Sequence, residues 1–182
     1  MAHVILGLLL IAPQSYYDLI KAFEAGVGLF YSASSGSIKR ALDRLLAQGL
    51  VEVADAESGG RGRKAYRPTG AGREEFGSWM AAPPTGSDAE SGALARLYFL
   101  GLLEEAERLP VLRGIEERLE GDLAALQDLD RGLDTRDVPE GLHEVFAYQR
   151  ATLDYGLAAN RFALGRFRAL IDRHERGEPP RD

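Results

Sequence analysis

The sequence predicts a mainly α-helical protein with two domains. Apolar residues recur at helical spacing along most of its 182 residues, and only two short segments resemble strands. A proline-containing segment at residues 82–87 separates a first half of short elements from a second half of long helices. We therefore expect a domain over residues 1–82, a linker over 83–89, a helical domain over 90–176 and a frayed tail over 177–182.

Three short helices are expected before the strands. An apolar run over residues 4–11 forms the first, and Ser15 with Asp18 caps the second, over residues 15–23. The third spans residues 34–48, is capped by Ser34 or Ser35, and ends at Gly49. Its helical spacing separates an apolar arc from a polar, mainly basic side. The apolar arc holds Ile38, Ala41, Leu42 and Leu45, and the polar side holds Ser37, Lys39, Arg40, Asp43 and Arg44.

Two strands joined by a basic loop follow the third helix. Residues 50–54 and 65–68 are the expected strands. The segment between them is rich in glycine and places Arg61, Arg63 and Lys64 within four residues. Thr69 then caps a helix expected over residues 70–80.

The second half is expected to consist of helices. Ser87 and Glu90 form a capping box for a helix that reaches Leu102. Pro110 suits the first position of the next helix, and Pro139 starts the last one, which runs to about Arg176. Apolar residues in both long helices alternate by three and four, as they do in coiled coils. The apolar seams of helices this long are too extensive to be buried by the small first domain alone.

The charge of the chain is unevenly distributed. The net charge is −6, but residues 1–82 hold nine Lys and Arg against eight Asp and Glu, a net of +1. The acidic excess therefore belongs to the second half, and the basic residues of the first half gather between residues 39 and 73. Such an asymmetry raises the question of nucleic-acid binding.

Several functional classes are excluded or have no supporting motif. The chain has no cysteine, which excludes disulfides, thiolate metal sites and a cysteine nucleophile, and its three histidines lie far apart. No phosphate-binding loop, nucleophile elbow or dinucleotide motif is present, so we expect neither catalysis nor a cofactor or metal. The apolar opening is too short to span a bilayer, and we expect a cytoplasmic protein with no membrane partner.

The order of elements in the first half predicts a winged helix-turn-helix domain that binds double-stranded DNA. In such domains the third helix enters the major groove and the loop between the strands lies along the neighbouring backbone. The expected DNA-binding residues are Ser35, Ser37, Lys39, Arg40, Arg44, Arg61, Arg63, Lys64 and Tyr66. Two alternatives remain: the charges are ordinary solvated groups, or the winged domain serves protein–protein assembly without sequence-specific DNA binding.

The first half also resembles the PadR-type transcriptional regulators, over roughly residues 4–84. The resemblance includes Trp79 and the Thr-x-x-Gly-Arg pattern that begins at Thr69. Its other parts are Ile5-Leu6-Gly7-Leu8-Leu9, Tyr17-Asp18-Leu19-Ile20-Lys21, Phe30-Tyr31-Ser32, Ser35-Gly36-Ser37-Ile38, Gln48-Gly49-Leu50-Val51-Glu52 and Gly62-Arg63-Lys64-Ala65-Tyr66. This resemblance implies a cytoplasmic homodimer, usually a repressor, whose C-terminal helices hold the dimer together. Many members of the family also respond to small aromatic or amphipathic molecules, and the resemblance leaves the existence of an effector for this chain open.

Two positions depart from the family pattern. The family usually carries Tyr-Pro after Gly-Ser-Ile in the third helix, whereas this chain carries Lys39-Arg40. Gly62 stands where the family commonly has proline. Both departures put an inherited operator sequence in doubt, although neither argues against DNA binding.

The last helix carries two stripes whose roles the sequence leaves open. One stripe, expected at a C₂ dimer interface, contains Phe146, Leu153, Phe167 and Leu170. The other contains Tyr148, Thr152, Tyr155, Ala159 and Phe162, with its aromatic residues seven apart. These aromatic residues either fill a helix–helix or subunit core, or line an effector pocket together with Trp79, Tyr98 and Phe99.

Overall fold

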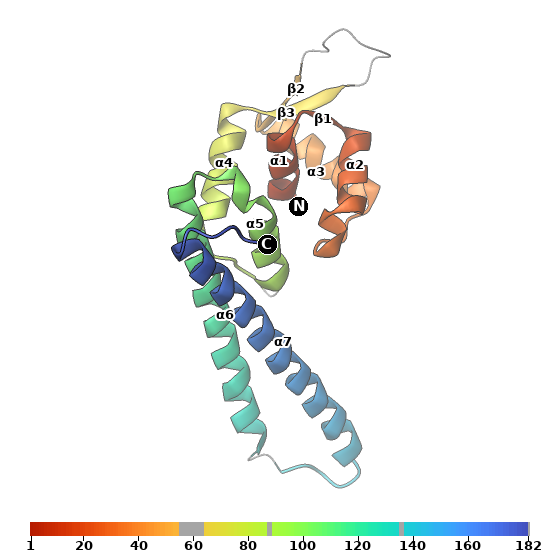
Figure 1. Cartoon of the computed structure of the whole chain (residues 1–182). Coiled ribbons are helices and arrows are strands. Elements are labelled where there is room, and N and C mark those ends of the chain that lie inside the picture. Colours follow the sequence, from red (N-terminus) through yellow and green to blue (C-terminus); the bar gives the residue numbers. More distant parts are fainter. Residues whose placement is uncertain (55–63, 87–88, 135–136, 182) are drawn as a thin grey trace. The chain divides into compact units, whose positions relative to one another are not determined.

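The computed structural model describes residues 1–54, 64–86, 89–134 and 137–181 (Figure 1). The chain divides into two compact units. The first contains Met1–Ala82 and Ser91–Val111, and the second contains Pro83–Glu90 and Leu112–Asp182. Among the described residues, no helix is both long and apolar enough to cross a membrane.

The elements confirm a mainly helical chain with an N-terminal winged helix-turn-helix domain. The short helices and the sheet precede two long helices. In chain order they are α1 (Ala2–Ile11), β1 (Gln14–Ser15), α2 (Tyr16–Ala25), η1 (Val27–Leu29), α3 (Ser35–Ala47), β2 (Val51–Ala54), β3 (Ala65–Pro68), α4 (Gly70–Ala81), α5 (Ala89–Phe99), η2 (Leu100–Leu102), α6 (Glu105–Asp134) and α7 (His143–Glu175), where η marks a 3-10 turn.

The sheet has one strand more than the sequence predicts. Its order is β1-β3-β2, and both pairings are antiparallel. The added strand, β1, pairs Gln14 with Tyr66 and Ser15 with Ala65. Two residues are too few to show the alternation that marks a strand, so β1 leaves no pattern in the sequence. Its pairing places β3 in the centre of the sheet, between β1 and β2.

Polar caps set the starts of the short helices, as predicted. Ser15 and Asp18 form the expected capping box at α2. Ser34, rather than Ser35, caps α3, and its Oγ accepts a hydrogen bond from the amide of Ser37 at 3.2 Å. Thr69 caps α4 in the same way. These caps satisfy amides that would otherwise lack partners, so local sequence is sufficient to place each helix start.

The core of the first unit forms around α1, which lies against α3, α4 and β3. Ile5 and Leu6 of α1 are completely buried, as are Leu19 of α2 and Leu42 of α3. The apolar run at the start of the chain is therefore the central core helix. Burial of apolar surface on several sides of one helix explains why its sequence is hydrophobic around its whole circumference.

Helix α5 packs with the first unit, whereas the sequence analysis placed residues 90–176 in a separate domain. Phe99 is only 1% exposed, and its ring lies 5.9 Å from the ring of Phe76. Arg96 is 4% exposed and donates hydrogen bonds to the carbonyls of Trp79 and Ala82 at the end of α4. Burial lowers the pKa of Arg96. These two side chains attach α5 to the helices before the proline-containing segment.

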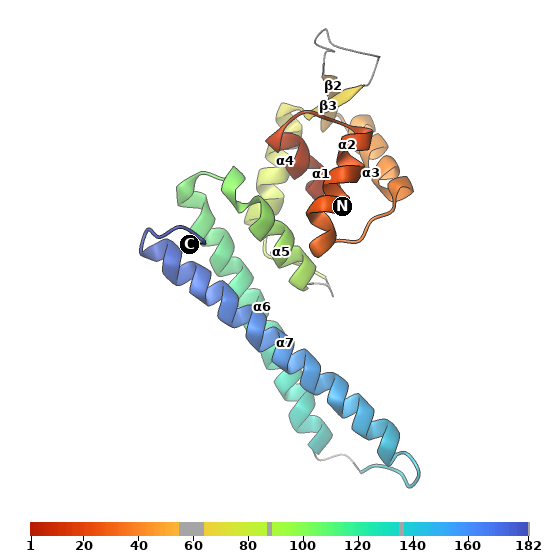
Figure 2. The same ribbon diagram turned by 45° about the vertical axis from the view of Figure 1, so that its right-hand side comes forward.

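The second unit consists mainly of α6 and α7, which run antiparallel (Figures 1 and 2). Ion pairs join the helices along their length. Arg168 pairs with Glu116 at 3.0 Å and with Glu120, while Arg150 pairs with Asp130 at 2.9 Å. Burial opposes ionisation of Glu116, but hydrogen bonds from Arg168 and Arg113 outweigh it and lower the pKa of this carboxyl. Between the ion pairs lies an apolar seam that includes Ile115, Leu119, Leu153, Leu157, Leu164 and Phe167.

Both long helices begin elsewhere than predicted. Pro110 lies inside α6, which starts at Glu105, because the Glu107 carboxylate accepts the Glu104 amide and caps the helix one turn earlier. Helix α7 starts at His143, after a turn with Gly141 at φ +87. The predicted cap Ser87 lies outside the described residues.

The close contact between α4 and the start of β2 yields a prediction. A Cβ on Gly72 would lie 2.0 Å from the carbonyl oxygen of Leu50. Gly72→Ala should therefore lower the free energy of unfolding by about 1–3 kcal/mol, because the backbone must shift to admit the methyl group. Chemical denaturation monitored by circular dichroism measures this change.

Gly77 provides the matched control in the same helix. A Cβ there meets nothing within 4 Å. Gly77→Ala should therefore raise stability by up to about 1 kcal/mol, since alanine favours helix. Equal effects of the two substitutions would contradict the close contact at Gly72.

Candidate nucleic-acid interface

The buried arc of α3 fixes which of its residues face outward. Ile38, Leu42 and Leu45 are at most 1% exposed and pack into the core of the first unit. Lys39, Arg40, Asp43 and Arg44 are exposed on the other side. Both arcs agree with the sequence prediction. The helix therefore presents three cations and one acidic residue outward from a rigid base.

One edge of the exposed face lies beside α2 and β3. The phenolic groups of Tyr16 and Tyr66 are close enough to Lys39 to influence its pKa. A hydrogen bond to Asp43 is the largest influence, and together these groups raise the pKa of Lys39. Lys39 is therefore firmly cationic and lies close to the central strand of the sheet.

The arginines occupy the middle and the opposite edge of this face. Arg40 lies along the helix toward Gly36, with Nη1 3.6 Å from the position a Cβ would take there. Nε of Arg44 donates to the carbonyl of Arg40 at 3.4 Å. The amino group of Met1 has a lowered pKa, first because of burial and second because of the Arg44 charge. Arg44 thus lies on the side of α3 that faces the start of α1, away from Lys39.

Ser35 and Ser37, at the start of α3, differ in whether their hydroxyl groups are already hydrogen-bonded within the protein. Ser37 Oγ donates to the Ser34 carbonyl at 2.7 Å, so its hydroxyl proton already has an acceptor within the helix. The sequence predicts that this hydroxyl donates to DNA, but in the structure it donates within the helix. Ser35 is exposed, and its carbonyl accepts a hydrogen bond from the hydroxyl of Tyr16 at 2.9 Å. Ser35 is therefore the better placed donor of the two.

Tyr16 belongs to this face although the sequence does not predict it there. It is the first residue of α2, and its hydroxyl ties that helix to the first turn of α3. The contact spans 19 residues, and no local pattern predicts it. Its only signal was an aromatic residue directly after a helix cap.

The strand pair supplies part of the predicted wing. Lys64 is exposed directly before β3, and Tyr66 is half-buried in that strand opposite Val53. Arg67 forms a cross-strand ion pair with Glu52 at 2.7 Å. Arg61 and Arg63 lie outside the described residues.

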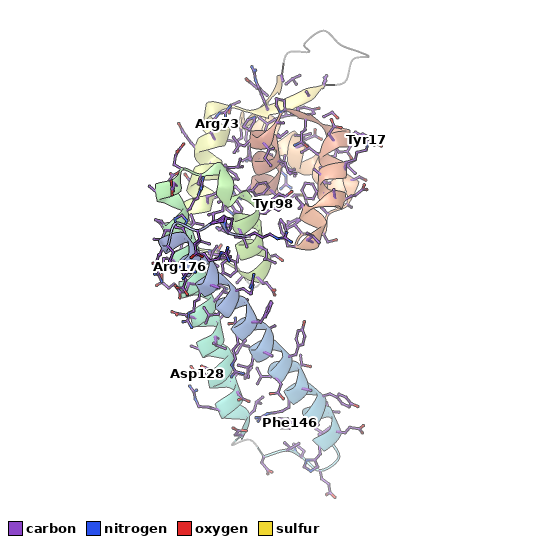
Figure 3. The ribbon with its side chains drawn as sticks, in the orientation of Figure 1. Tyr17, Arg73, Tyr98, Asp128, Phe146 and Arg176 are labelled. Atoms are coloured by element: carbon purple, nitrogen blue, oxygen red, sulfur yellow. The ribbon has the colours of Figure 1, made fainter. Side chains whose placement is uncertain are left out.

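The residues predicted for an effector pocket divide between the two units. In the first unit, Trp79 stacks on His3 at 5.0 Å and lies under the Arg96 guanidinium, while Tyr98 and the buried Phe99 lie on α5 (Figure 3). The second unit contains the remaining four, Tyr148, Thr152, Tyr155 and Phe162, and all of them are exposed on α7. The two groups therefore belong to separately packed parts of the chain.

The stripe expected at the dimer interface is largely used within the chain. Leu153 and Phe167 are 8% and 4% exposed, because the α6–α7 seam covers them. Phe146, in the first turn of α7 (Figure 3), and Leu170 are half-buried. The aromatic residues of the other stripe remain exposed instead.

Comparisons with known proteins identify the family. The family described as "Transcriptional regulator PadR-like family" matches residues 5–78. A probable transcriptional regulator of Mycobacterium tuberculosis is 31% identical over 149 residues, which cover 68% of this chain and 79% of that protein. The chain belongs to the PadR-like family. It is a transcriptional regulator of that family, which confirms the resemblance seen in the sequence.

Further PadR relatives show lower identity. The negative transcriptional regulator PadR of Bacillus subtilis is 25% identical over 127 residues, covering 69% of this chain and 70% of that protein. The crystal structure of B. subtilis PadR in complex with operator DNA has a TM-score of 0.41 and 21% identity, covering 95% of this chain and 98% of that one.

The Tyr16 hydrogen bond yields a second prediction. Tyr16→Phe removes only the hydroxyl that donates to Ser35, so the free energy of unfolding should fall by about 1 kcal/mol. Tyr17→Phe is the matched control, because the Tyr17 hydroxyl makes no hydrogen bond to the described residues. Urea titration of both variants measures the difference, and equal stabilities would show that the bond contributes nothing.

Proposed function

We propose that this PadR-like regulator is a cytoplasmic repressor that binds a palindromic operator as a homodimer. Helix α3 enters the major groove and the β2–β3 wing lies along the adjacent backbone. One observation carries the proposal: the exposed side of α3 combines Lys39, Arg40 and Arg44 on a helix whose other side is fixed in the core. The width of the major groove admits one such helix.

The exposed side chains suit different parts of a DNA site. Arg40 lies in the middle of the exposed arc and has no ion-pair partner among the described residues, so its guanidinium is available for bidentate contact with guanine. Lys39, at the edge beside β3, suits a phosphate, although it must first exchange Asp43 for that phosphate. Arg44 suits the outer edge of the same contact. Lys64 extends the cationic surface to the wing.

A homodimer accounts for recognition of a palindrome. Two copies related by a two-fold axis place two α3 helices in successive major grooves, about 34 Å apart. Occupancy of such a site near a promoter blocks transcription. The exposed aromatic stripe of α7 supports self-association, because large contiguous apolar patches on soluble proteins mark interaction sites.

We further propose that a small aromatic or amphipathic effector releases the operator. A hollow of about 630 Å³ between α6 and α7 supports this role. Its lining is mainly apolar, including Leu119, Leu126 and Ala159. The polar groups of the lining are Glu90, Arg118, Asp122 and Asn160. Asn160 Oδ1 is buried without a hydrogen-bond donor among the described residues, so it suits an effector that carries a hydroxyl or amine. Such a ligand releases DNA only to the extent that it prefers the non-binding arrangement.

Binding to DNA from upstream of the chain's own gene tests the proposal. Fluorescence anisotropy at ~150 mM salt with excess non-specific competitor screens out weak phosphate contacts. Tight binding that survives supports sequence-specific regulation. If selection from whole-genome fragments also recovers no bound sequence, the winged domain serves protein–protein assembly instead.

A third prediction concerns Arg40. Arg40→Ala should weaken operator binding by about 1–3 kcal/mol and relax base preference at one position in each half-site. Arg131→Ala removes the same charge from an exposed position of α6 and is the control. Loss of the same affinity in both variants would indicate a general charge effect rather than base reading.

A fourth prediction concerns the wing. Lys64→Ala should weaken binding to operator and random DNA alike and reduce the salt slope by roughly one, because a phosphate contact releases about one counterion. Neutralising Arg61, Arg63 and Lys64 together should abolish DNA affinity. Retained affinity in this triple variant would remove the wing from the interface.

A further inference from the structure

One acidic residue, Asp43, shares the exposed side of α3 with three cations. The inward direction of this helix is the middle of its buried arc, which contains Ile38, Ala41, Leu42 and Leu45. At about 100° per residue, Arg40 and Asp43 lie roughly 30° on either side of the opposite, outward direction. Lys39 and Arg44 lie roughly 70° from that direction, one on each margin of the exposed side. Asp43 is therefore as central to this surface as Arg40.

The two residues nearest the outward direction are small. Gly36 and Ala47 lie roughly 10° from it, one near each end of α3, and both are exposed. Neither carries a long side chain that could cover the middle of the helix. When such a helix enters the major groove, the side chains of Arg40 and Asp43 are the first groups to meet the base edges.

A carboxylate in this position needs a hydrogen-bond donor. In the chain without DNA, Asp43 Oδ1 accepts a hydrogen bond from Lys39 Nζ. If Lys39 turns to a phosphate, as proposed above, the carboxylate loses this donor. A carboxylate without a donor is costly once water is displaced from the interface. The bound DNA must therefore supply a donor of its own.

The major groove contains only two kinds of base donor, the N4 amino group of cytosine and the N6 amino group of adenine. Adenine places the acceptor N7 beside its amino group, and this lone pair repels a carboxylate. Cytosine has no acceptor on its major-groove edge, so it suits an aspartate better. Arg40 and Asp43 are three residues apart, about 4.5 Å along the helix, which is close to one base-pair step of about 3.4 Å. The two side chains therefore suit neighbouring base pairs.

We propose that Asp43 is a specificity-determining residue of this regulator, and that its carboxylate accepts a hydrogen bond from the N4 amino group of a cytosine. This cytosine lies in the base pair next to the guanine that Arg40 contacts. The inference rests on the DNA binding proposed above and adds a second base to each half-site. The same carboxylate repels phosphates, so it weakens attachment to sequences that lack the cytosine.

Selection from a library of randomised double-stranded DNA tests this assignment on the full chain. The unmodified chain should enrich cytosine beside guanine in each half-site, and anisotropy should show at least about fivefold tighter binding with cytosine than with adenine at that position. Asp43→Asn should reverse the preference to adenine, because an asparagine amide binds N6 and N7 of adenine together. A merely structural role of Asp43 would not exchange one base for another.

The charge of Asp43 leads to a second expected effect. Asp43→Asn should raise affinity for random DNA about two- to fivefold, because it removes a negative charge near the phosphates and frees Lys39. Asp128→Asn is the matched control, since it removes the same charge from an exposed position of α6 that also pairs with a cation of its own helix. This control should change neither affinity nor base preference. Asp43→Glu keeps a carboxylate that can only accept, and it should retain cytosine over adenine.

The outcomes separate the reading of cytosine from DNA binding itself. If the unmodified chain enriches no sequence, both the proposed operator binding and the role of Asp43 are overturned. If it enriches a sequence without cytosine beside guanine, or one that Asp43→Asn leaves unchanged, the role of Asp43 alone is overturned. An equal change in Asp128→Asn also overturns that role. A shift to adenine confined to Asp43→Asn supports it.

Discussion

Burial of the apolar arc of α3 against the core around α1 is the constraint on which the proposed DNA-binding surface depends. Ile38, Leu42 and Leu45 are almost completely buried, so α3 cannot rotate about its axis without exposing them. Because the apolar side of α3 is held in the core, its opposite side faces outward, and Lys39, Arg40 and Arg44 project from it in a defined order. Tyr16 adds a second restraint at the first turn through the Ser35 carbonyl. A reading helix needs this rigidity, because bidentate contact with a base tolerates little misplacement.

The two faces of α7 differ in burial. The seam with Leu153 and Phe167 packs against α6 and is flanked by the ion pairs of Arg150 and Arg168. The aromatic residues of the other face, Tyr148, Tyr155 and Phe162, are mostly exposed. These side chains expose a large apolar area to water, and surfaces of this kind mark interaction sites. The hollow lined by Tyr155, Ala159 and Asn160 lies beside this face.

A few side chains of α5 determine that this helix packs with the first unit. Its Arg96 enters the first unit, donates to carbonyls at the end of α4, and lies 4.5 Å from the centre of the Trp79 ring. A buried guanidinium needs acceptors for its protons, and the free carbonyls of a helix end supply them. Phe99 adds apolar burial next to Gly7, where a Cβ would lie only 2.8 Å from its ring. Together they explain why α5 belongs with the helices that precede the proline-containing segment.

The sequence by itself determined the elements that depend on local chemistry. Caps at Ser15, at Ser34 or Ser35, and at Thr69 follow from interactions within a few residues, and the structure selects Ser34. The two arcs of α3 and the strands around the basic loop are also predicted from local sequence. Only the tertiary structure decided which partner each surface meets. Both stripes of α7 carry apolar residues at similar spacing, and periodicity cannot show which one packs against α6. Likewise β1, the Tyr16 contact and the placement of α5 depend on residues far apart in the chain, for which one sequence contains no local signal.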